Sequence, residues 1–230
     1  IIVNIGPSGT GKTTQPPLNT SLAKQTSGRI WVLGQDVTQL DEEAMNQVRL
    51  RMGMVFQYSA LFDSMTVGDN VAFGLRQHTK LTEEEISRIV KRKLRMVGLV
   101  GREELLPGQL SGGMKKRVSL ARAIANNPEV VVYDEPAAGL DPVMTEKIDR
   151  LILGARRMTG VTSVVVTHYM NSAMRIADRI AMLHEGKVIA IDTKERMQET
   201  TDPVVYQFIH GMKRPGAAAM RRMLSEGKHE

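Results

Sequence analysis

The segment GPSGTGKT, from Gly6 to Thr13, follows the spacing G-x-x-x-x-G-K-[ST]. In this arrangement glycines let backbone N–H groups turn toward phosphate oxygens, the lysine reaches the terminal phosphates, and the hydroxyl ligates magnesium. The apolar run IIVNI precedes the segment, as expected for a strand that leads into a phosphate-binding loop. A plain glycine-rich turn is the alternative, but it needs neither Lys12 nor Thr13. The predicted phosphate-binding residues are Gly6, Pro7, Ser8, Gly9, Thr10, Gly11, Lys12 and Thr13.

A pair of acids, Asp134 and Glu135, follows the apolar run VVVY. We expect this run to be a strand of a parallel sheet, with its carboxyl end beside the phosphate-binding loop. There Asp134 can hold magnesium through water, and Glu135 can polarise the attacking water as a general base. A solvated strand end is the alternative, but it would not favour acids directly after an apolar run.

His168 ends another apolar run, SVVVTH, and is predicted to face the same crevice. A histidine at a strand end is, taken alone, more often a structural residue than a catalytic one. The presence of Lys12 and Glu135 in the same chain favours the functional interpretation, in which His168 contacts the γ-phosphate.

The rest of the chain alternates strand and helix patterns. Apolar runs predict strands at IIVNI, GRIWVLG, RMGMVFQ, EVVVYDEP and TSVVVTH, and RIAMLHEGKVIAI predicts a hairpin around a Glu-Gly turn. Residues 66 to 125 are strongly helical in pattern, and the acidic TEEE at 82 to 85 suits a helix start. The sequence therefore predicts an α/β sheet core interrupted by a helical insertion.

Composition sets the broad class of the protein. With 230 residues we expect one domain with lobes, and the absence of cysteine excludes a disulfide framework or a thiolate metal site. No apolar run approaches the roughly 18–20 residues of a membrane-spanning helix, so we expect a soluble chain. The net charge of +6 permits an acidic partner such as nucleic acid, phosphate or an anionic membrane, but an aromatic content of 4% argues against a single-strand binder.

The stretch LSGGMKKRVSLARAIA, residues 110 to 125, adds a second candidate anion site. Ser111, Gly112 and Gly113 are predicted to open a helix whose first N–H groups are exposed, and a chain with two such sites favours a composite arrangement. Here the sequence resembles the ABC transporter ATPases, over residues 1 to about 212. In that family this signature closes over the γ-phosphate held by the other subunit of a head-to-tail dimer.

The resemblance implies a role for each matching residue. It implies a P-loop NTPase fold with a RecA-like, mostly parallel sheet core and an inserted helical subdomain at about 66–125, followed by a tail at 213–230. It implies ATP and Mg²⁺ as cofactors, and adds Gln57 as the Q-loop residue and Asp141 as the D-loop residue to the motifs above. The implied catalytic residues are Glu135, His168 and Gln57, the implied magnesium ligands are Thr13, Gln57 and Asp134, and the further nucleotide contacts are Ser111, Gly112, Gly113 and Asp141.

A finer resemblance comes from Met114, where most ABC ATPases carry Gln, and from the segments SALFDSMTVGDNVAFGL, YDEPAAGLDP and DPVVYQFIHG. These resemble the Mkl/MlaF branch, whose transporters work with MCE-domain lipid-binding proteins. The resemblance implies a phospholipid or related cargo. It also implies a homodimer of ATPase subunits, two permease copies docked beside Gln57, an MCE-domain protein and no nucleic-acid partner. The chain would then lie at the cytoplasmic face of the plasma membrane through its permease.

Two other functions remain open at this stage. An ATPase of a different importer, for example one for amino acids, would share every catalytic residue. A soluble ABC protein that acts on DNA or ribosomes is the second, although such proteins usually carry a long coiled-coil insertion or tandem ATPase domains.

Three departures from the family pattern also stand out. The aromatic residue that stacks on adenine, normally about two dozen residues before the phosphate loop, has no counterpart, so we expect the first strands to be missing. Tyr169 stands where the branch usually has Asp. Pro16 and Pro17 fall where the helix after the loop should continue, with Gln15 before them, and are expected to kink that helix or delay its start.

Overall fold

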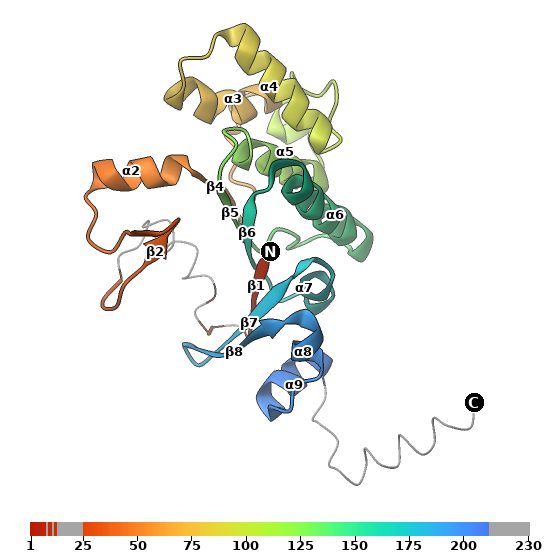
Figure 1. The fold of residues 1–230 in the computed structure, drawn as a ribbon. Helices are drawn as coiled ribbons and strands as arrows, with labels where there is room; N and C mark the ends of the chain where they lie inside the picture. Colours follow the sequence, from red (N-terminus) through yellow and green to blue (C-terminus); the bar gives the residue numbers. More distant parts are fainter. Residues whose placement is uncertain (8, 11, 13–24, 212–230) are drawn as a thin grey trace.

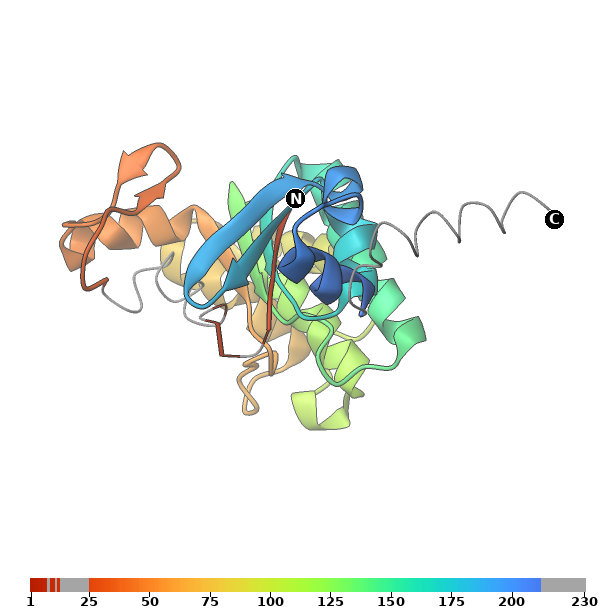
Figure 2. The same cartoon turned by 90° about the horizontal axis from the view of Figure 1, so that it is seen from below.

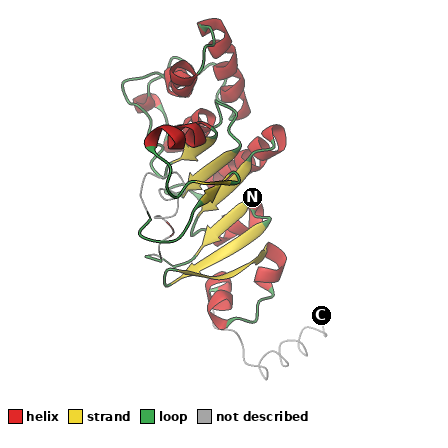
Figure 3. Ribbon diagram, turned by 60° about the vertical axis from the view of Figure 1, so that its left-hand side comes forward, coloured by secondary structure: helices red, strands yellow, loops and turns green. Residues whose placement is uncertain are grey.

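The central feature of the molecule is one six-stranded sheet. The computed structural model describes residues 1–7, 9, 10, 12 and 25–211 (Figure 1). In spatial order the strands are β4 (Met52–Val55), β5 (Val130–Asp134), β6 (Thr162–Val166), β1 (Ile2–Ile5), β7 (Arg179–His184) and β8 (Lys187–Thr193). The first five of these run parallel and only β8 is antiparallel, which confirms the predicted mostly parallel α/β sheet (Figure 3).

The sequences of the strands explain their positions. The continuous apolar run of β5 is buried on both faces, as a central parallel strand requires, whereas β8 is exposed along most of its length because it lies at the sheet edge. β1 lies between β6 and β7, so Ile2 pairs with both Val164 and Arg179. Each predicted strand of the sheet is present, and the predicted Glu-Gly hairpin joins β7 to β8.

Helices connect and cover these strands (Figures 1 and 3). The described helices are α2 (Glu42–Leu50), α3 (Val67–His78), α4 (Glu83–Met96), the 3₁₀ turn η2 (Pro107–Gln109), α5 (Gly112–Ala123), α6 (Pro142–Thr159), α7 (Met170–Ile176), α8 (Lys194–Gln198) and α9 (Pro203–His210). The TEEE segment begins α4 as predicted: Thr82 accepts from the N–H of Glu85, and the Glu85 carboxylate accepts from the N–H of Thr82.

The helices α3, α4 and α5 are the insertion expected between β4 and β5 (Figure 1). α3 and α4 lie at one end of the molecule, opposite α8 and α9, and α5 joins them to the sheet. α5 packs so closely on β4 that a Cβ at Gly53 would lie 2.3 Å from the carbonyl oxygen of Ala123. Residues of α3, α4 and α5 share one hydrophobic core with the sheet, so the insertion is fixed to the strand ends that carry the predicted acids.

A second, smaller core lies to one side of the sheet, where α2 meets the hairpin of β2 (Trp31–Val32) and β3 (Gln35–Asp36) (Figure 2). The predicted strand GRIWVLG is therefore much shorter than its apolar run, because Leu33 and Gly34 turn the chain with positive φ. α2 was not predicted from the sequence, although the Asp41 side chain caps its start by accepting from the N–H of Ala44.

Across the described part of the chain, every helix is too short or too polar to cross a bilayer.

Candidate functional site

The loop after β1 carries the candidate phosphate-binding residues. Gly6 has φ of 149° and Gly9 has φ of 80°, and a Cβ at Gly6 would lie 2.1 Å from the carbonyl oxygen of Leu183. Only glycine fits at position 6, where the loop after β1 packs against β7. The Thr10 hydroxyl closes the loop by donating to the carbonyl of Pro7 at 2.9 Å. Ser8, Gly11 and Thr13, and the departures at Gln15, Pro16 and Pro17, lie outside the described residues.

Lys12 reaches back across this loop. Its Nζ donates to the carbonyl oxygen of Pro7 at 2.5 Å, and the residue is only 7% exposed. Burial lowers the pKa of the Lys12 ammonium, and the nearby Glu135 carboxylate opposes that shift. The loop and the end of β5 are therefore close enough to interact electrostatically.

Asp134 and Glu135 stand at the carboxyl end of β5. The Oδ1 atom of Asp134 is buried and has no hydrogen-bond partner among the described residues. Burial raises the pKa of Asp134, as does the neighbouring Glu135 charge, while Lys116 lowers it. A buried carboxylate oxygen without a partner is energetically unfavourable, so this atom favours a bound cation.

The backbone of Glu135 is strained: its φ of 44° is rare for a residue with a side chain. The N–H of Glu135 donates to the carbonyl of Val166 at 2.9 Å, which fixes this turn against β6. Glu135 is 7% exposed, and its Oε1 lies 2.8 Å from Nδ1 of His168. The N–H of His168 also points to Oε2 of Glu135 at 3.4 Å. The structure thus brings together Glu135, which follows β5, and His168, which follows β6.

The His168 ring is the exposed half of this pair. Its side chain is 52% exposed, against 9% for Glu135, and its ring packs on Tyr169 with centroids 4.2 Å apart. Tyr169, the departure noted in the sequence, therefore lies against the histidine and begins α7.

Gln57 is linked to the same edge of the sheet through Lys116 of α5. The Lys116 Nζ donates to the Gln57 carbonyl oxygen, and Lys116 interacts electrostatically with Asp134 and Glu135. Lys116 is 7% exposed, and burial lowers the pKa of its ammonium. This lysine was not predicted from the sequence, because it lies between Lys115 and Arg117 in a basic stretch and carries no local signal of burial.

Ser111, Gly112 and Gly113 form the start of α5, but the structure does not join them to the phosphate loop. Ser111 caps the helix by accepting from the N–H of Met114 at 3.3 Å. Within the described residues, no hydrogen bond or ion pair links these three to Lys12, and Ser111 and Gly112 are exposed. The start of α5 is therefore open to solvent at Ser111 and Gly112, while Gly113 is buried.

Asp141 caps the next helix, because its carboxylate accepts from the N–H of Met144 at 2.9 Å. Two turns later Asp149, which is fully buried, accepts from the Ser172 hydroxyl and from Arg175, each at 2.5 Å. This contact joins α6, which begins at Asp141, to α7, which follows His168.

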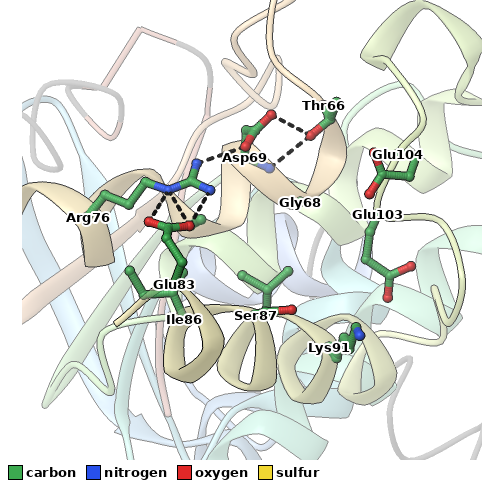
Figure 4. Close-up of a pocket in the computed structure, with 12 residues that line it drawn as sticks. Thr66, Gly68, Asp69, Arg76, Glu83, Ile86, Ser87, Lys91, Glu103 and Glu104 are labelled. Carbon is green, nitrogen blue, oxygen red and sulfur yellow. Dashed lines mark hydrogen bonds and ion pairs between the residues drawn. The ribbon is translucent and has the colours of Figure 1, made fainter. Parts of the chain in front are cut away.

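A cavity of about 260 Å³ lies away from these residues, between α3 and α4 (Figure 4). Arg76 stands between Asp69 and Glu83 and pairs with both at 2.8 Å. All three charged groups are partly exposed, and the single cation Arg76 is already paired with two carboxylates, so the cavity offers no equivalent of the phosphate loop.

A family model described as ABC transporter matches residues 1–138. The chain belongs to the ABC transporter family. The match runs from β1 past the acids at the end of β5.

Curated relatives extend the match of this ABC chain almost to its end. The "Probable ribonucleotide transport ATP-binding protein mkl" of Mycobacterium leprae is 39% identical over 92% of the chain and 61% of the relative. The "Intermembrane phospholipid transport system ATP-binding protein MlaF" is 42% identical in Haemophilus influenzae, over 90% of the chain and 78% of the relative. The MlaF of Escherichia coli K12 is 40% identical over 90% and 77%. The predicted resemblance to the Mkl/MlaF branch is confirmed, and the chain spans about 60% of the length of the mycobacterial relatives.

Solved structures agree with the fold of the ABC chain. A dimeric, post-hydrolysis state of the ATP-binding cassette MJ0796 bound to ADP and Pi superimposes with a TM-score of 0.77 at 33% identity. The match covers 84% of this chain and 85% of that one, and a second dimeric structure of MJ0796 matches equally well. The predicted P-loop NTPase fold with an inserted helical segment is thereby confirmed.

Proposed function

We propose that this chain is the ATP-binding and ATP-hydrolysing subunit of an ABC transporter that moves phospholipid. The observation that carries the proposal is the convergence of Lys12, Asp134, Glu135 and His168 at one edge of the sheet. Three separate strands supply these residues, which is the arrangement needed around a terminal phosphate.

Within this site Glu135 is the proposed general base. Its carboxylate would accept the proton of the water that attacks the γ-phosphate. His168 holds one carboxylate oxygen at 2.8 Å and exposes the rest of its ring, so it can orient Glu135 and contact the phosphate. Lys12 and the turned N–H groups of the loop would hold the phosphate oxygens, which carry growing negative charge during transfer.

The site also fits a magnesium ion. The unpartnered, buried Oδ1 of Asp134 is a hard oxygen ligand of the kind that Mg²⁺ prefers, and we propose that Thr13 and Gln57 complete the protein's share of the ligands. When bound, the ion would neutralise charge on the β- and γ-phosphate oxygens.

The site is proposed to be composite, with Ser111, Gly112, Gly113 and Asp141 serving a nucleotide held by a second copy. The exposure of Ser111 and Gly112 at the start of α5 and the dimeric form of MJ0796 support this arrangement. The test mixes two inactive variants, Lys12→Ala and Ser111→Arg. In a mixed composite dimer both lesions fall in one site and the other site is intact, so ATP hydrolysis should recover on mixing. Activity that stays absent in verified mixed dimers would mean that each site belongs to one chain.

The cargo is proposed from the relatives' names. Two kinds of transport are named, ribonucleotide for the mycobacterial relatives and phospholipid for MlaF. The phospholipid assignment is favoured because the chain is 42% identical to MlaF of H. influenzae and covers 78% of it, against 39% and 61% for M. leprae mkl. We propose a permease and an MCE-domain protein as partners, with the chain at the cytoplasmic membrane face. Copurification with the permease, followed by analysis of bound lipid and of ATP turnover with added phospholipid or ribonucleotide, separates the two cargoes.

A further inference from the structure

The loop that follows β4 is held by α5 through main-chain contacts. Lys116 donates to the carbonyl of Gln57, and six residues further along α5 Arg122 donates to the carbonyls of Ser59 and Ala60 at 3.0 and 2.7 Å. Six residues of α-helix span about 9 Å, so the two cations bind the loop at two separate points. Two-point attachment resists rotation of the loop as well as translation.

The far end of the same loop is held by a different helix. Asn70 of α3 is fully buried, and its side chain accepts from the N–H of Phe62 at 2.9 Å and donates to the carbonyls of Phe62, Met65 and Thr66. The guanidinium of Arg122 also lies 5.7 Å from the centre of the Phe62 ring. The loop is thus fastened at both ends.

The conformation between these points needs such support. Ser59 and Ala60 both have positive φ, 65° and 46°, which costs each residue about 1 kcal/mol or more. A strained, non-glycine turn of this kind persists only where surrounding contacts determine it. Arg122 supplies such contacts, because its guanidinium donates to the carbonyls of the two strained residues.

The helix that holds this loop also links to both halves of the proposed ATP site. Lys116 interacts electrostatically with Asp134 and Glu135, and α5 is capped at its start by Ser111, the residue proposed to face the second nucleotide. α5 is 12 residues long and joins these points as one rigid element.

We propose that Lys116 and Arg122 are positioning residues that tether the 57–60 loop to α5, so that Gln57 and the Ser111 end of the helix move as one body. The proposal rests on the proposed ATPase function, since it concerns the placing of Gln57 in that site. Neither residue touches the nucleotide in this scheme. Lys116 sets the position of the Gln57 main chain, and Arg122 keeps the strained turn beyond it from relaxing.

The test compares the full chain with Arg122→Met and Lys116→Met. Amide hydrogen exchange in 57–62 should accelerate about tenfold or more in Arg122→Met, because the contacts that fix the turn are lost. Arg117→Met is the matched control: Arg117 lies on the same helix but donates to the carbonyls of Val97 and Gly98, so its loss should affect exchange there and not in the loop.

Turnover gives the second measurement. Both tether variants should lower kcat for ATP about tenfold or more, with the ATP dissociation constant changed less than about twofold, because a misplaced Gln57 affects reaction more than binding. Arg122→Lys can donate to one of the two carbonyls but not to both, so its kcat should lie between those of the parent and of Arg122→Met. If Arg122→Met fails to fold, the kcat and the amide exchange of Arg122→Lys test the tether in its place.

Unchanged exchange in 57–62 for both tether variants would overturn the tether. Faster exchange with unchanged kcat would overturn the positioning role. A parent chain that hydrolyses no ATP even with its permease would contradict the proposed function instead, while the exchange comparison, which needs no nucleotide, would still decide whether the tether exists.

Discussion

Lys93 provides a prediction whose size follows from the structure. The side chain, on α4, is 1% exposed, and its Nζ donates to the carbonyl of Ile124 at 2.6 Å and to Oδ1 of Asn127 at 2.7 Å. Both partners are neutral, so these two hydrogen bonds bring no negative charge to balance the buried ammonium group. Burial, together with the adjacent Arg92, lowers the pKa of Lys93 from 10.5 to about 8.

This shift makes stability depend on pH in a defined direction. In the unfolded chain Lys93 keeps its proton up to about pH 10.5, whereas in the folded chain it loses it near pH 8. Between these values the unfolded state binds more protons, so the free energy of unfolding rises with pH. The difference between a pKa of 10.5 and one of about 8 corresponds to about 3 kcal/mol, of which roughly 1.3 kcal/mol should appear between pH 7 and pH 9.

The assay is urea unfolding of the parent chain and of Lys93→Met at pH 7, 8 and 9, because other titrating groups cancel in the difference between the two proteins. The variant should be less stable at pH 7 by about 1–3 kcal/mol, since two acceptors lose their donor, and this deficit should grow by roughly 1.3 kcal/mol at pH 9. Lys91→Met, which removes an exposed lysine from the same helix, is the control for an unspecific effect of charge. A deficit that stays constant or shrinks as pH rises would refute the reasoning.

Three further changes have defined outcomes. Glu135→Gln should lower ATP turnover by about 10²–10⁴ and leave ATP binding intact, because the amide keeps its shape but cannot accept the proton; near-normal hydrolysis would exclude Glu135 as the base. Asp149→Ala leaves two donors of α7 without their acceptor, so calorimetry should show a loss of about 3 kcal/mol, or about 6–12 °C, against almost none for Glu146→Gln in an exposed ion pair. Gly53→Ala places a Cβ 2.3 Å from a carbonyl oxygen of α5 and should destabilise by about 3 kcal/mol, whereas Gly108→Ala meets nothing within 4 Å and should be tolerated.

The strands and the main helices could be predicted because each is encoded locally. β5 and β6 are continuous apolar runs, and the start of α4 has its cap and acids in adjacent positions. The hairpin β2–β3 was harder, because its length depends on a turn at Leu33 that the apolar pattern does not reveal.

The candidate site was predictable where a local sequence motif contains its residues, as with Lys12, Glu135 and His168. The supporting contacts were not, because they join residues distant in sequence. Lys116 meets Gln57 across 59 positions, and Arg122 meets Ser59 across 63. No local pattern shows which lysine or arginine of a basic helix turns inward, since that choice depends on the packing of α5 against the loop.

The place of β1 in the sheet has a consequence for synthesis of the chain. β1 precedes the other described strands in sequence, yet both of its neighbours, β6 and β7, come from residues 162 onward. At about 5–20 residues per second, a ribosome needs roughly 8–30 s to supply the first of these partners. Throughout that interval β1 and the phosphate loop lack the two strands that hold them in the described sheet, so the nucleotide site should form only late in translation.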